Sequence, residues 1–285
     1  MKIALPTDAP EAAGLPPASM QEINAARFYE HSLLPALFSQ YAPRVVAAGG
    51  IRAGHRVLDV ACGTGVVSRE AATVTGDAAL VTGIDISPGM LTVARDACPT
   101  LDWRPGDATD LPFADAVFDR VVCQFGLMFF SDPVKALEEM LRVLKPGGRI
   151  AVAVWDSIST APCSAGMYEV LERMAGTRAA EAIRQPYRLG AIAQLEGLAQ
   201  AAGMREFEIR THAGEARFPD LRVLMDAEIR GWLPIMGVHL DEPLIEAIEA
   251  ECARRFRDWI DTSGALRTPT SAHILVAVAD GGTES

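Results

Sequence analysis

Residues 57–65 read VLDVACGTG, a short apolar run that ends in a glycine-rich turn. The run 57–61 is apolar on both faces, which is typical of a buried parallel strand. Gly63 and Gly65 then allow the backbone to approach a ligand closely, because a β-carbon would obstruct it. In an open parallel sheet, ligands bind outside the carboxyl ends of the strands. This stretch therefore predicts a buried strand followed by a ligand-binding loop.

Strands and helices alternate from this loop onward. The pairs Ser87-Pro88 and Asp132-Pro133 each supply a capping residue and a proline at the first helical position. Such alternation predicts a parallel sheet with helices on both faces. Two later strands are expected to pair antiparallel and complete the sheet. The expected strands are 57–61, 80–86, 101–104, 118–125, 149–155, 207–212 and 273–279.

The expected fold class is α/β, with a Rossmann-like, doubly wound, mostly parallel seven-stranded sheet and a helical cap insertion. Two segments interrupt the regular alternation with irregular helical patterns, and we expect them to cover the carboxyl edge of the sheet. The expected division of the chain is a mobile leader at 1–18, lid helices and the ligand-binding core at 19–155, the cap and acceptor region at 156–189 and 214–265, and the rest of the sheet with the C-terminal tail at 190–213 and 266–285.

The composition disfavours several classes of protein. The net charge is −11, and a negative field repels polyanions, so we expect no nucleic-acid partner. No apolar run is long enough to cross a bilayer, and the first one is too short for a signal peptide, so no membrane partner is expected. The five cysteines are widely spaced without a CxxC pair, which disfavours disulfides and zinc clusters. These features predict a cytoplasmic protein without a metal; the oligomeric state stays open.

The second strand ends in a carboxylate that could bind a nucleoside. Asp85 follows Gly65 by 20 residues and can accept hydrogen bonds from both hydroxyls of a ribose. A nicotinamide dinucleotide would also fit, but its fingerprint needs a third glycine where this chain has Ser68. We expect Asp59 at the mouth of the loop, where it would repel a pyrophosphate and attract an ammonium group. S-adenosylmethionine has the ribose and the ammonium without a phosphate, and is therefore the predicted cofactor.

Four motifs in order make residues 54–155 similar to class I S-adenosylmethionine-dependent methyltransferases related to the ubiquinone/menaquinone C-methyltransferases (methyltransferase type 11). The similarity covers about a third of the chain. It implies methyl transfer from S-adenosylmethionine to a small-molecule acceptor. The motifs are VLDVACGTG at 57–65, GIDIS at 83–87, GDA at 106–108 and LKPGG at 144–148.

The resemblance also implies which residues contact the cofactor. Asp59 and the backbone of Gly63-Thr64-Gly65 would hold its methionine portion. Three further residues have plainer alternatives, which are core packing for Met90, a turn cap for Asp107 and packing of the lid onto the sheet for Tyr29. The other implied contacts are Asp85 with the ribose hydroxyls, Ile86 and Met90 with the adenine faces, Asp107 with the adenine amino group, the Ala108 N–H with a ring nitrogen, Gln124 with the methionine end and acceptor channel, and Tyr29 with the cofactor's carboxylate.

No catalytic residue is assigned from the sequence. The sulfonium of the cofactor carries its own leaving group, so a base is needed only when the acceptor must lose a proton. His31 near the lid and His239 in the cap are the candidate bases. The remaining histidines, expected to be structural, are His55, His212 and His273.

The acceptor site is expected in the cap. Segment 229–239 contains Trp232 and Met236 and has weak helical signals, so we expect it to border a pocket for a largely apolar or aromatic small molecule. The alternative is that both side chains only pack the cap onto the sheet. Two other functions stay open, a nicotinamide-dependent oxidoreductase and a non-catalytic regulator that binds S-adenosylmethionine. Transfer to carbon, oxygen or nitrogen is equally open.

Overall fold

The computed structural model describes residues 17–280, so nearly all of the expected leader at 1–18 lies outside the described residues. Within this part of the chain, no helix combines the length and the apolar character needed to cross a membrane. Its strands form one seven-stranded sheet in the order β3-β2-β1-β4-β5-β7-β6. Their bounds are β1 Val57–Val60, β2 Val81–Asp85, β3 Asp102–Pro105, β4 Phe118–Gln124, β5 Leu144–Trp155, β6 Phe207–Phe218 and β7 Leu266–Val278.

The predicted sheet is confirmed in its strand number and directions. Strands β1 to β5 are parallel, and β7 lies antiparallel between β5 and β6. This order separates the chain from the dinucleotide-binding fold, whose usual order is 3-2-1-4-5-6 without an inserted antiparallel strand. The fold is the Rossmann-like fold of class I methyltransferases.

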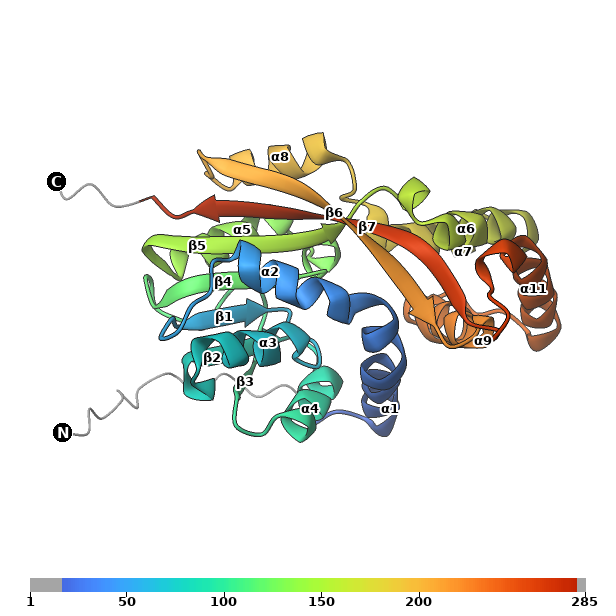
Figure 1. The fold of residues 1–285 in the computed structure, drawn as a ribbon, viewed down its shortest axis with the longest axis horizontal. Helices are drawn as coiled ribbons and strands as arrows, with labels where there is room; N and C mark the ends of the chain where they lie inside the picture. Colours follow the sequence, from blue (N-terminus) through green and yellow to red (C-terminus); the bar gives the residue numbers. More distant parts are fainter. Residues whose placement is uncertain (1–16, 281–285) are drawn as a thin grey trace.

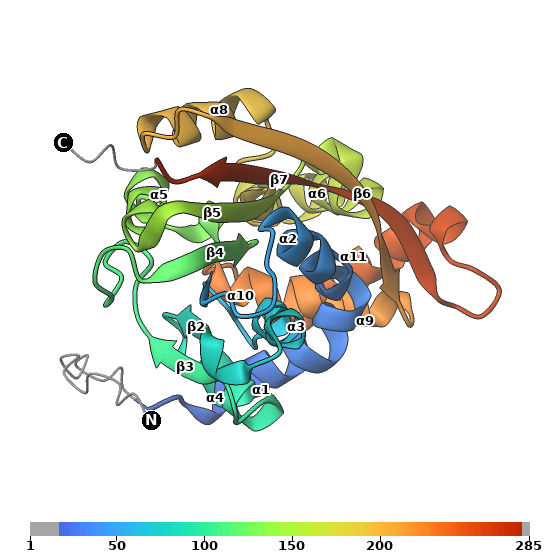
Figure 2. The same ribbon diagram turned by 60° about the vertical axis from the view of Figure 1, so that its left-hand side comes forward.

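Helices cover both faces of the sheet (Figures 1 and 2). Helices α2, α3 and α4 lie on one face, and α5 and α8 pack together on the other. The predicted caps are present, because the Ser87 and Asp132 side chains accept hydrogen bonds from the first turns of α4 and α5. These helices are α2 Ala42–Ala48, α3 Val66–Thr75, α4 Pro88–Ala97, α5 Pro133–Arg142 and α8 Ile192–Ala201.

The N-terminal lid is one nearly continuous helical segment. It begins with α1 (Met20–Phe28), which Ser19 caps through a capping box with Glu22. The chain then continues without a break as a π-helix, η1 (Tyr29–Phe38). Helix α1 packs closely on α4, and a β-carbon on Gly89 would come within 2.8 Å of the α1 backbone. The lid therefore rests directly beside the end of β2.

Strands β6 and β7 are longer than expected and carry the cap (Figure 1). They pair from Phe207 to Phe218, so β6 runs past the strand expected at 207–212 and into the expected cap segment 214–265. The sequence of β7 hid its first half because it contains Pro269. The half of β7 before Ala272 does not pair with β5, so a proline is tolerated on that unpaired side.

The cap has a hydrophobic core of its own, separate from the core around the sheet. Buried side chains from six helices of the cap and from the outer ends of β6 and β7 meet there, among them Met167, Leu171, Ile248 and Phe256. One of these helices, α7, was not expected from the sequence. The cap elements are α6 Pro162–Met174, α7 Thr177–Arg184, η6 Gln185–Tyr187, α9 Leu221–Met225, the π-helix η7 Asp226–Trp232, α10 Leu233–Ile235 and α11 Glu242–Arg255.

Candidate functional site

The carboxyl ends of the parallel strands turn sharply at one edge of the sheet. Ala61 follows β1 with a φ of 56°, and Phe125 follows β4 with a φ of 57°. Both are unfavourable for residues with a β-carbon, and such conformations cluster at functional sites. The two turns also touch, because a β-carbon on Gly126 would lie 2.6 Å from that of Ala61. The backbone at the ends of β1 and β4 is thus closely packed and restricted in conformation.

The glycine loop lies at this edge. Gly63 has a φ of 56° and open space where a β-carbon would be, so a ligand can approach its backbone. Gly65 has a φ of 92°, and a β-carbon there would be 2.2 Å from the ring of Trp103. The space beside Gly65 is therefore filled by a side chain of β3, and the expected reason for this glycine was wrong. Its φ and the Trp103 ring both require glycine.

Asp85 connects the loop to the end of β2. Its Oδ2 accepts a hydrogen bond from the Gly63 N–H at 2.7 Å, and its Oδ1 accepts one from the Ser87 N–H at 2.8 Å. Burial raises the pKa of this carboxyl, while these backbone donors act in the opposite direction. Each carboxylate oxygen keeps a second lone pair, so Asp85 can still accept hydrogen bonds from a ligand. The carboxylate is held in place before any ligand binds.

Asp59 lies beneath the loop. Its side chain is 1% exposed, and its Oδ2 accepts a hydrogen bond from the Ser68 hydroxyl at 2.6 Å. Burial raises the pKa of Asp59 to about 7. The expected position at the mouth of the loop was therefore wrong, because the carboxylate is covered by protein. The structure also explains why serine occupies position 68. A glycine there would remove the hydroxyl that donates to the buried Asp59 carboxylate.

The residues expected around adenine follow β2 and β3. Ile86 is 60% exposed directly after Asp85, and Met90 is half-buried in the first turn of α4. Asp107 is exposed, and its Oδ1 accepts hydrogen bonds from the Thr109 N–H and hydroxyl, both at 2.8 Å. Asp107 thus caps a turn, which is its plainer role.

The two loops that carry these residues lie together. The Gly106 N–H donates to the backbone oxygen of Asp85 at 3.1 Å. This contact places the loop with Asp107 and the buried Ala108 beside the end of β2.

Arg69 fastens the lid to the glycine loop. Its guanidinium forms an ion pair with Glu30 of η1 at 2.9 Å and donates to the backbone oxygen of Thr64 at 2.6 Å. Where η1 meets the sheet edge, three buried oxygen atoms have no protein partner. Unpaired buried oxygens are costly, so their presence in one region indicates that a ligand supplies donors. They are Glu30 Oε2, Thr64 Oγ1 and Gln124 Oε1.

Tyr29 packs within the lid and lies near the carboxylates of the site. Its ring packs on Phe38 with centroids 5.1 Å apart, which holds the lid together. Burial raises the pKa of its hydroxyl, and the charges of Glu30, Asp85 and Asp59 raise that pKa further. The Tyr29 side chain therefore lies among the carboxylates of the site.

An aromatic cluster beside Gln124 was missed in the sequence. Phe125 and Trp155, which follow β4 and end β5, stack with centroids 3.9 Å apart and planes at 10°. Rings from the lid and from the cap complete the cluster. The signal that could have revealed it is the aromatic residue at the end of two neighbouring parallel strands. Its members are Phe38, Tyr41, Phe125, Trp155 and Tyr187.

The cap approaches this cluster through η7. The Trp232 indole donates to the Ala182 backbone oxygen at 2.7 Å, and its ring lies 5.5 Å from that of Phe129. Trp232 therefore packs η7 against α7 and against the segment after β4, which is the alternative weighed for it. Met236 is half-buried against the cap core.

Glu228, also on η7, was missed in the sequence. It is half-buried between the buried Ala227 and Ile229, and burial raises its pKa to about 7. The charge of Glu228 is among the causes that raise the pKa of Tyr187, after burial itself. Tyr187 in turn shares a hydrogen bond of 2.8 Å with Ser164 and lies 6.3 Å from the Trp155 ring. The charge of Glu228 thus acts on Tyr187, one member of the aromatic cluster, and a carboxylate between two buried apolar neighbours is the signal that could have found it.

The histidines add little to the site. His31 contacts the backbone oxygen of Arg27 at 2.7 Å on the exposed side of the lid, and His239 is exposed. His273 is buried in β7 and bonds Thr211, as expected for a structural histidine. Across residues 17–280, no three side chains of His, Cys, Asp or Glu gather as metal ligands.

Known methyltransferases resemble the sheet part of this chain. Residues 58–152 match the family described as "Methyltransferase domain". A demethylmenaquinone methyltransferase of Renibacterium salmoninarum is 48% identical over 129 residues, which cover 45% of this chain and 53% of that protein. A ubiquinone/menaquinone biosynthesis C-methyltransferase of Haemophilus ducreyi is 42% identical over 38% of this chain and 44% of its own length. The chain therefore matches about half the length of these relatives, and the cap lies outside the family match.

Solved structures show the same fold. The YcgJ protein of Bacillus subtilis has a TM-score of 0.56 at 18% identity, covering 85% of this chain and 99% of its own. Phosphoethanolamine N-methyltransferase 2 of Haemonchus contortus, in complex with S-adenosyl-L-methionine, has a TM-score of 0.54 at 19% identity, covering 90% of this chain and 56% of its own. Residues 58–152 of this chain thus match a methyltransferase domain family, which uses S-adenosylmethionine.

Proposed function

We propose that this protein binds S-adenosylmethionine at the carboxyl edge of its sheet and transfers the methyl group to a small, largely apolar or aromatic acceptor. The observation that carries the proposal is the set of oxygen atoms without hydrogen-bond partners beside two carboxylates. Arg69, the cation at this place, is already paired with Glu30. Such a site favours a ligand with an ammonium and a sulfonium, and it disfavours a pyrophosphate. A nicotinamide cofactor therefore fits less well.

The carboxylates and the loop hold the polar parts of the cofactor in this proposal. Asp85 binds the ribose hydroxyls with its two free lone pairs. Asp59 attracts the ammonium group from beneath the loop, through its field and not by direct contact. The remaining proposed contacts are Gly63, Thr64 and Gly65 with the methionine portion, Ile86, Met90, Asp107 and Ala108 with adenine, and Tyr29 and Gln124 with the methionine end.

The protein's contribution to the reaction is alignment and exclusion of water. When bound, the cofactor supplies a methyl group on a positively charged sulfur. The ion pair between Arg69 and Glu30 keeps the lid over the glycine loop and limits water there. The faces of Phe125 and Trp155 favour a neighbouring cation and can hold a flat acceptor in line with the methyl group. Alignment of this kind can account for much of the rate gain in a methyl transfer.

The acceptor side lies between the aromatic cluster and the cap. This cluster favours an apolar or aromatic acceptor. The relatives act, by their names, on demethylmenaquinone, ubiquinone or menaquinone precursors, which supports a ring compound as the acceptor class. We assign the role of proton acceptor to Glu228, a half-buried carboxylate of η7 whose charge acts on Tyr187 and whose pKa of about 7 suits a base at neutral pH. The chemistry then corresponds to methylation of a weakly acidic O–H or C–H group.

Calorimetry and mass spectrometry test the proposal. S-adenosylhomocysteine should bind in the micromolar range or tighter, and NADH should bind negligibly. Equal or tighter binding of NADH would contradict the cofactor assignment. Incubation with deuterium-labelled S-adenosylmethionine and a panel of naphthoquinols and phenols should then yield a product carrying the labelled methyl group. Tight binding without any labelled product across the panel would favour the non-catalytic regulator.

A further inference from the structure

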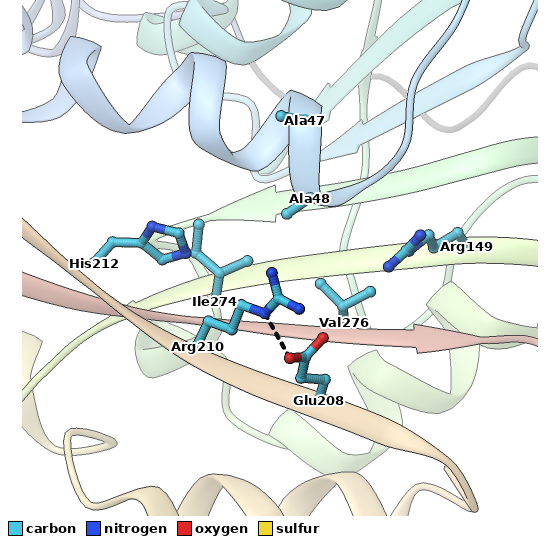
Figure 3. Close-up of a pocket in the computed structure, with 8 residues that line it drawn as sticks. All are labelled: Ala47, Ala48, Arg149, Glu208, Arg210, His212, Ile274 and Val276. Atoms are coloured by element: carbon cyan, nitrogen blue, oxygen red, sulfur yellow. Dashed lines mark hydrogen bonds and ion pairs between the residues drawn. The ribbon is translucent and has the colours of Figure 1, made fainter.

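A second hollow lies on a face of the sheet, away from the cofactor edge (Figure 3). It has a volume of about 150 Å³ and opens between the end of α2 and strands β5, β7 and β6. Arg149 on β5 is six residues from Trp155, about 20 Å along the strand. His212, at the other end of the hollow, lies level with Trp155 across β7, because both pair with Ala272. The lining residues are Ala47, Ala48, Arg149, Glu208, Arg210, His212, Ile274 and Val276.

Two arginines stand side by side next to this hollow. Arg120 of β4 and Arg149 of β5 are register partners on neighbouring parallel strands. Like charges in such positions repel each other and destabilise the folded protein. The nearby Asp119 carboxylate is paired with Lys145 at 2.8 Å, and its charge also favours the charged form of Arg120. Within residues 17–280 Arg149 forms no ion pair, so it is the member of the pair whose charge is uncompensated next to the opening.

Arg149 also has unused hydrogen-bonding capacity. Its Nε is buried without a partner among the described residues, and its guanidinium lies at the hollow in Figure 3. A buried donor without an acceptor costs free energy unless a ligand or ion satisfies it. The neighbouring Arg120 Nε is satisfied by the Gly50 oxygen at 3.1 Å, which leaves Arg149 as the donor available to a ligand.

The opposite wall of the hollow is basic as well. Arg210 and His212 project from β6, and Glu208 pairs with Arg210 at 2.5 Å. Burial lowers the pKa of His212, and the charges of Arg44 and Arg210 lower it further. These shifts indicate a positive field at this place in a chain whose net charge is −11. The field therefore arises from local placement of cations.

The floor and roof are apolar. Ile274 and Val276 of β7 form the floor, and Ala47 and Ala48 of α2 form the roof. A cavity of this volume is large enough for a benzene ring. We propose that the hollow binds an oxyanion, a phosphate or a carboxylate, carried on a small apolar group. The oxyanion contacts Arg149, and the apolar group lies between the alanines and the β7 side chains.

Binding of phenyl phosphate, benzoate and inorganic phosphate by the full chain tests this inference. Calorimetry in chloride buffer at constant ionic strength should detect phenyl phosphate or benzoate at millimolar concentration or below, with inorganic phosphate weaker. Arg149→Gln should weaken binding at least tenfold, and the matched control Arg254→Gln, on the exposed side of α11, should leave it unchanged. Binding of phenyl phosphate as strong in Arg149→Gln as in the native chain would overturn the proposal.

Further readouts separate this site from the cofactor site and from misfolding. Arg149→Gln should retain or raise the melting temperature, because it removes one member of a like-charged pair, and should leave affinity for S-adenosylhomocysteine unchanged. If Arg149→Gln does not fold, Arg210→Gln replaces it with the same expected loss. If neither phenyl phosphate nor benzoate binds the native chain at concentrations up to about 10 mM, the proposal is contradicted. Equal affinity for inorganic phosphate would contradict the apolar part of the ligand.

Discussion

The sheet edge and the cap hold their polar groups in different ways. At the sheet edge, the backbone N–H groups of Gly63 and Ser87 fix Asp85 before any ligand arrives. In the cap, Glu228 sits on a π-helix that is positioned by side-chain packing, through Trp232 on Phe129 and Ala182. Backbone contacts permit few alternatives, whereas side-chain packing tolerates substitution. One scaffold can therefore keep its cofactor half constant while the acceptor half changes.

The largest expected effect belongs to the backbone-held edge. Asp85→Ala should weaken binding of S-adenosylhomocysteine at least a hundredfold, because two hydrogen bonds to a charged group are worth about 1.5–3 kcal/mol each. Calorimetry measures the affinity, and a melting curve confirms that the variant is folded. Asp107→Ala is the matched control and should cost less, since Asp107 also caps a turn. Equal losses in both variants would show that the edge is not organised around Asp85.

The next effect belongs to the packing in the cap. Trp232→Ala should lower the free energy of unfolding by about 3 kcal/mol. This value is at the lower end of the usual cost of replacing a buried aromatic side chain by alanine, because Trp232 is half-buried. Thermal and urea unfolding measure the change, and affinity for S-adenosylhomocysteine should stay the same. A melting temperature that does not change, together with a raised acceptor KM, would instead place Trp232 in the acceptor pocket.

A smaller effect is expected in the pH dependence of cofactor binding. Asp59 has a pKa of about 7 in the free protein, and a bound ammonium would lower that pKa. Binding then releases a proton, so affinity for S-adenosylhomocysteine should rise as the pH increases from 6 to 7 and level off above it, by up to about tenfold. Asp59→Asn should remove this dependence. A flat profile in the native protein would exclude Asp59 from the field at the ligand.

The smallest effect concerns the free carboxylate of the cap. The pKa of Glu228 in the folded protein, about 7, exceeds its ordinary 4.5, so ionisation between these values costs stability. Glu228→Gln should therefore raise the melting temperature by a few degrees at pH 8, an increase on the order of 1 kcal/mol, and change it little at pH 4.5. Glu249→Gln, which removes a partner of Arg230, should show no such gain. Equal shifts at both pH values would show that Glu228 is solvated.

The sheet edge could be predicted from the sequence because its signals are local. Apolar runs mark the buried strands, and caps before proline mark the starts of α4 and α5. The motif spacing places Gly63, Asp85 and Gln124 at the ends of neighbouring strands. The predictions that failed there concerned burial. A motif does not reveal that Ser68 holds Asp59 under the loop or that Trp103 fills the space beside Gly65.

The cap could be predicted only in outline, because its contacts are not local. Leu266 pairs with Phe218, although the two residues are far apart in the sequence. The half of β7 before Ala272 also contains Pro269, which conceals the strand in the sequence pattern. The charge of Glu228 acts on Tyr187 only because α7, η7 and the ribbon of β6 and β7 pack together. Pairing and burial between distant segments depend on the whole fold.

By itself, the sequence determined the doubly wound sheet, the glycine loop and the carboxylate that follows β2. Hydrophobic periodicity, capping residues and glycine positions act over a few residues, and these are legible without a structure. Only the tertiary structure decided that Asp59 is covered, that Arg120 and Arg149 lie side by side, and that the charge of Glu228 acts on Tyr187. The reason is that burial, charge environment and pKa depend on neighbours brought from far along the chain.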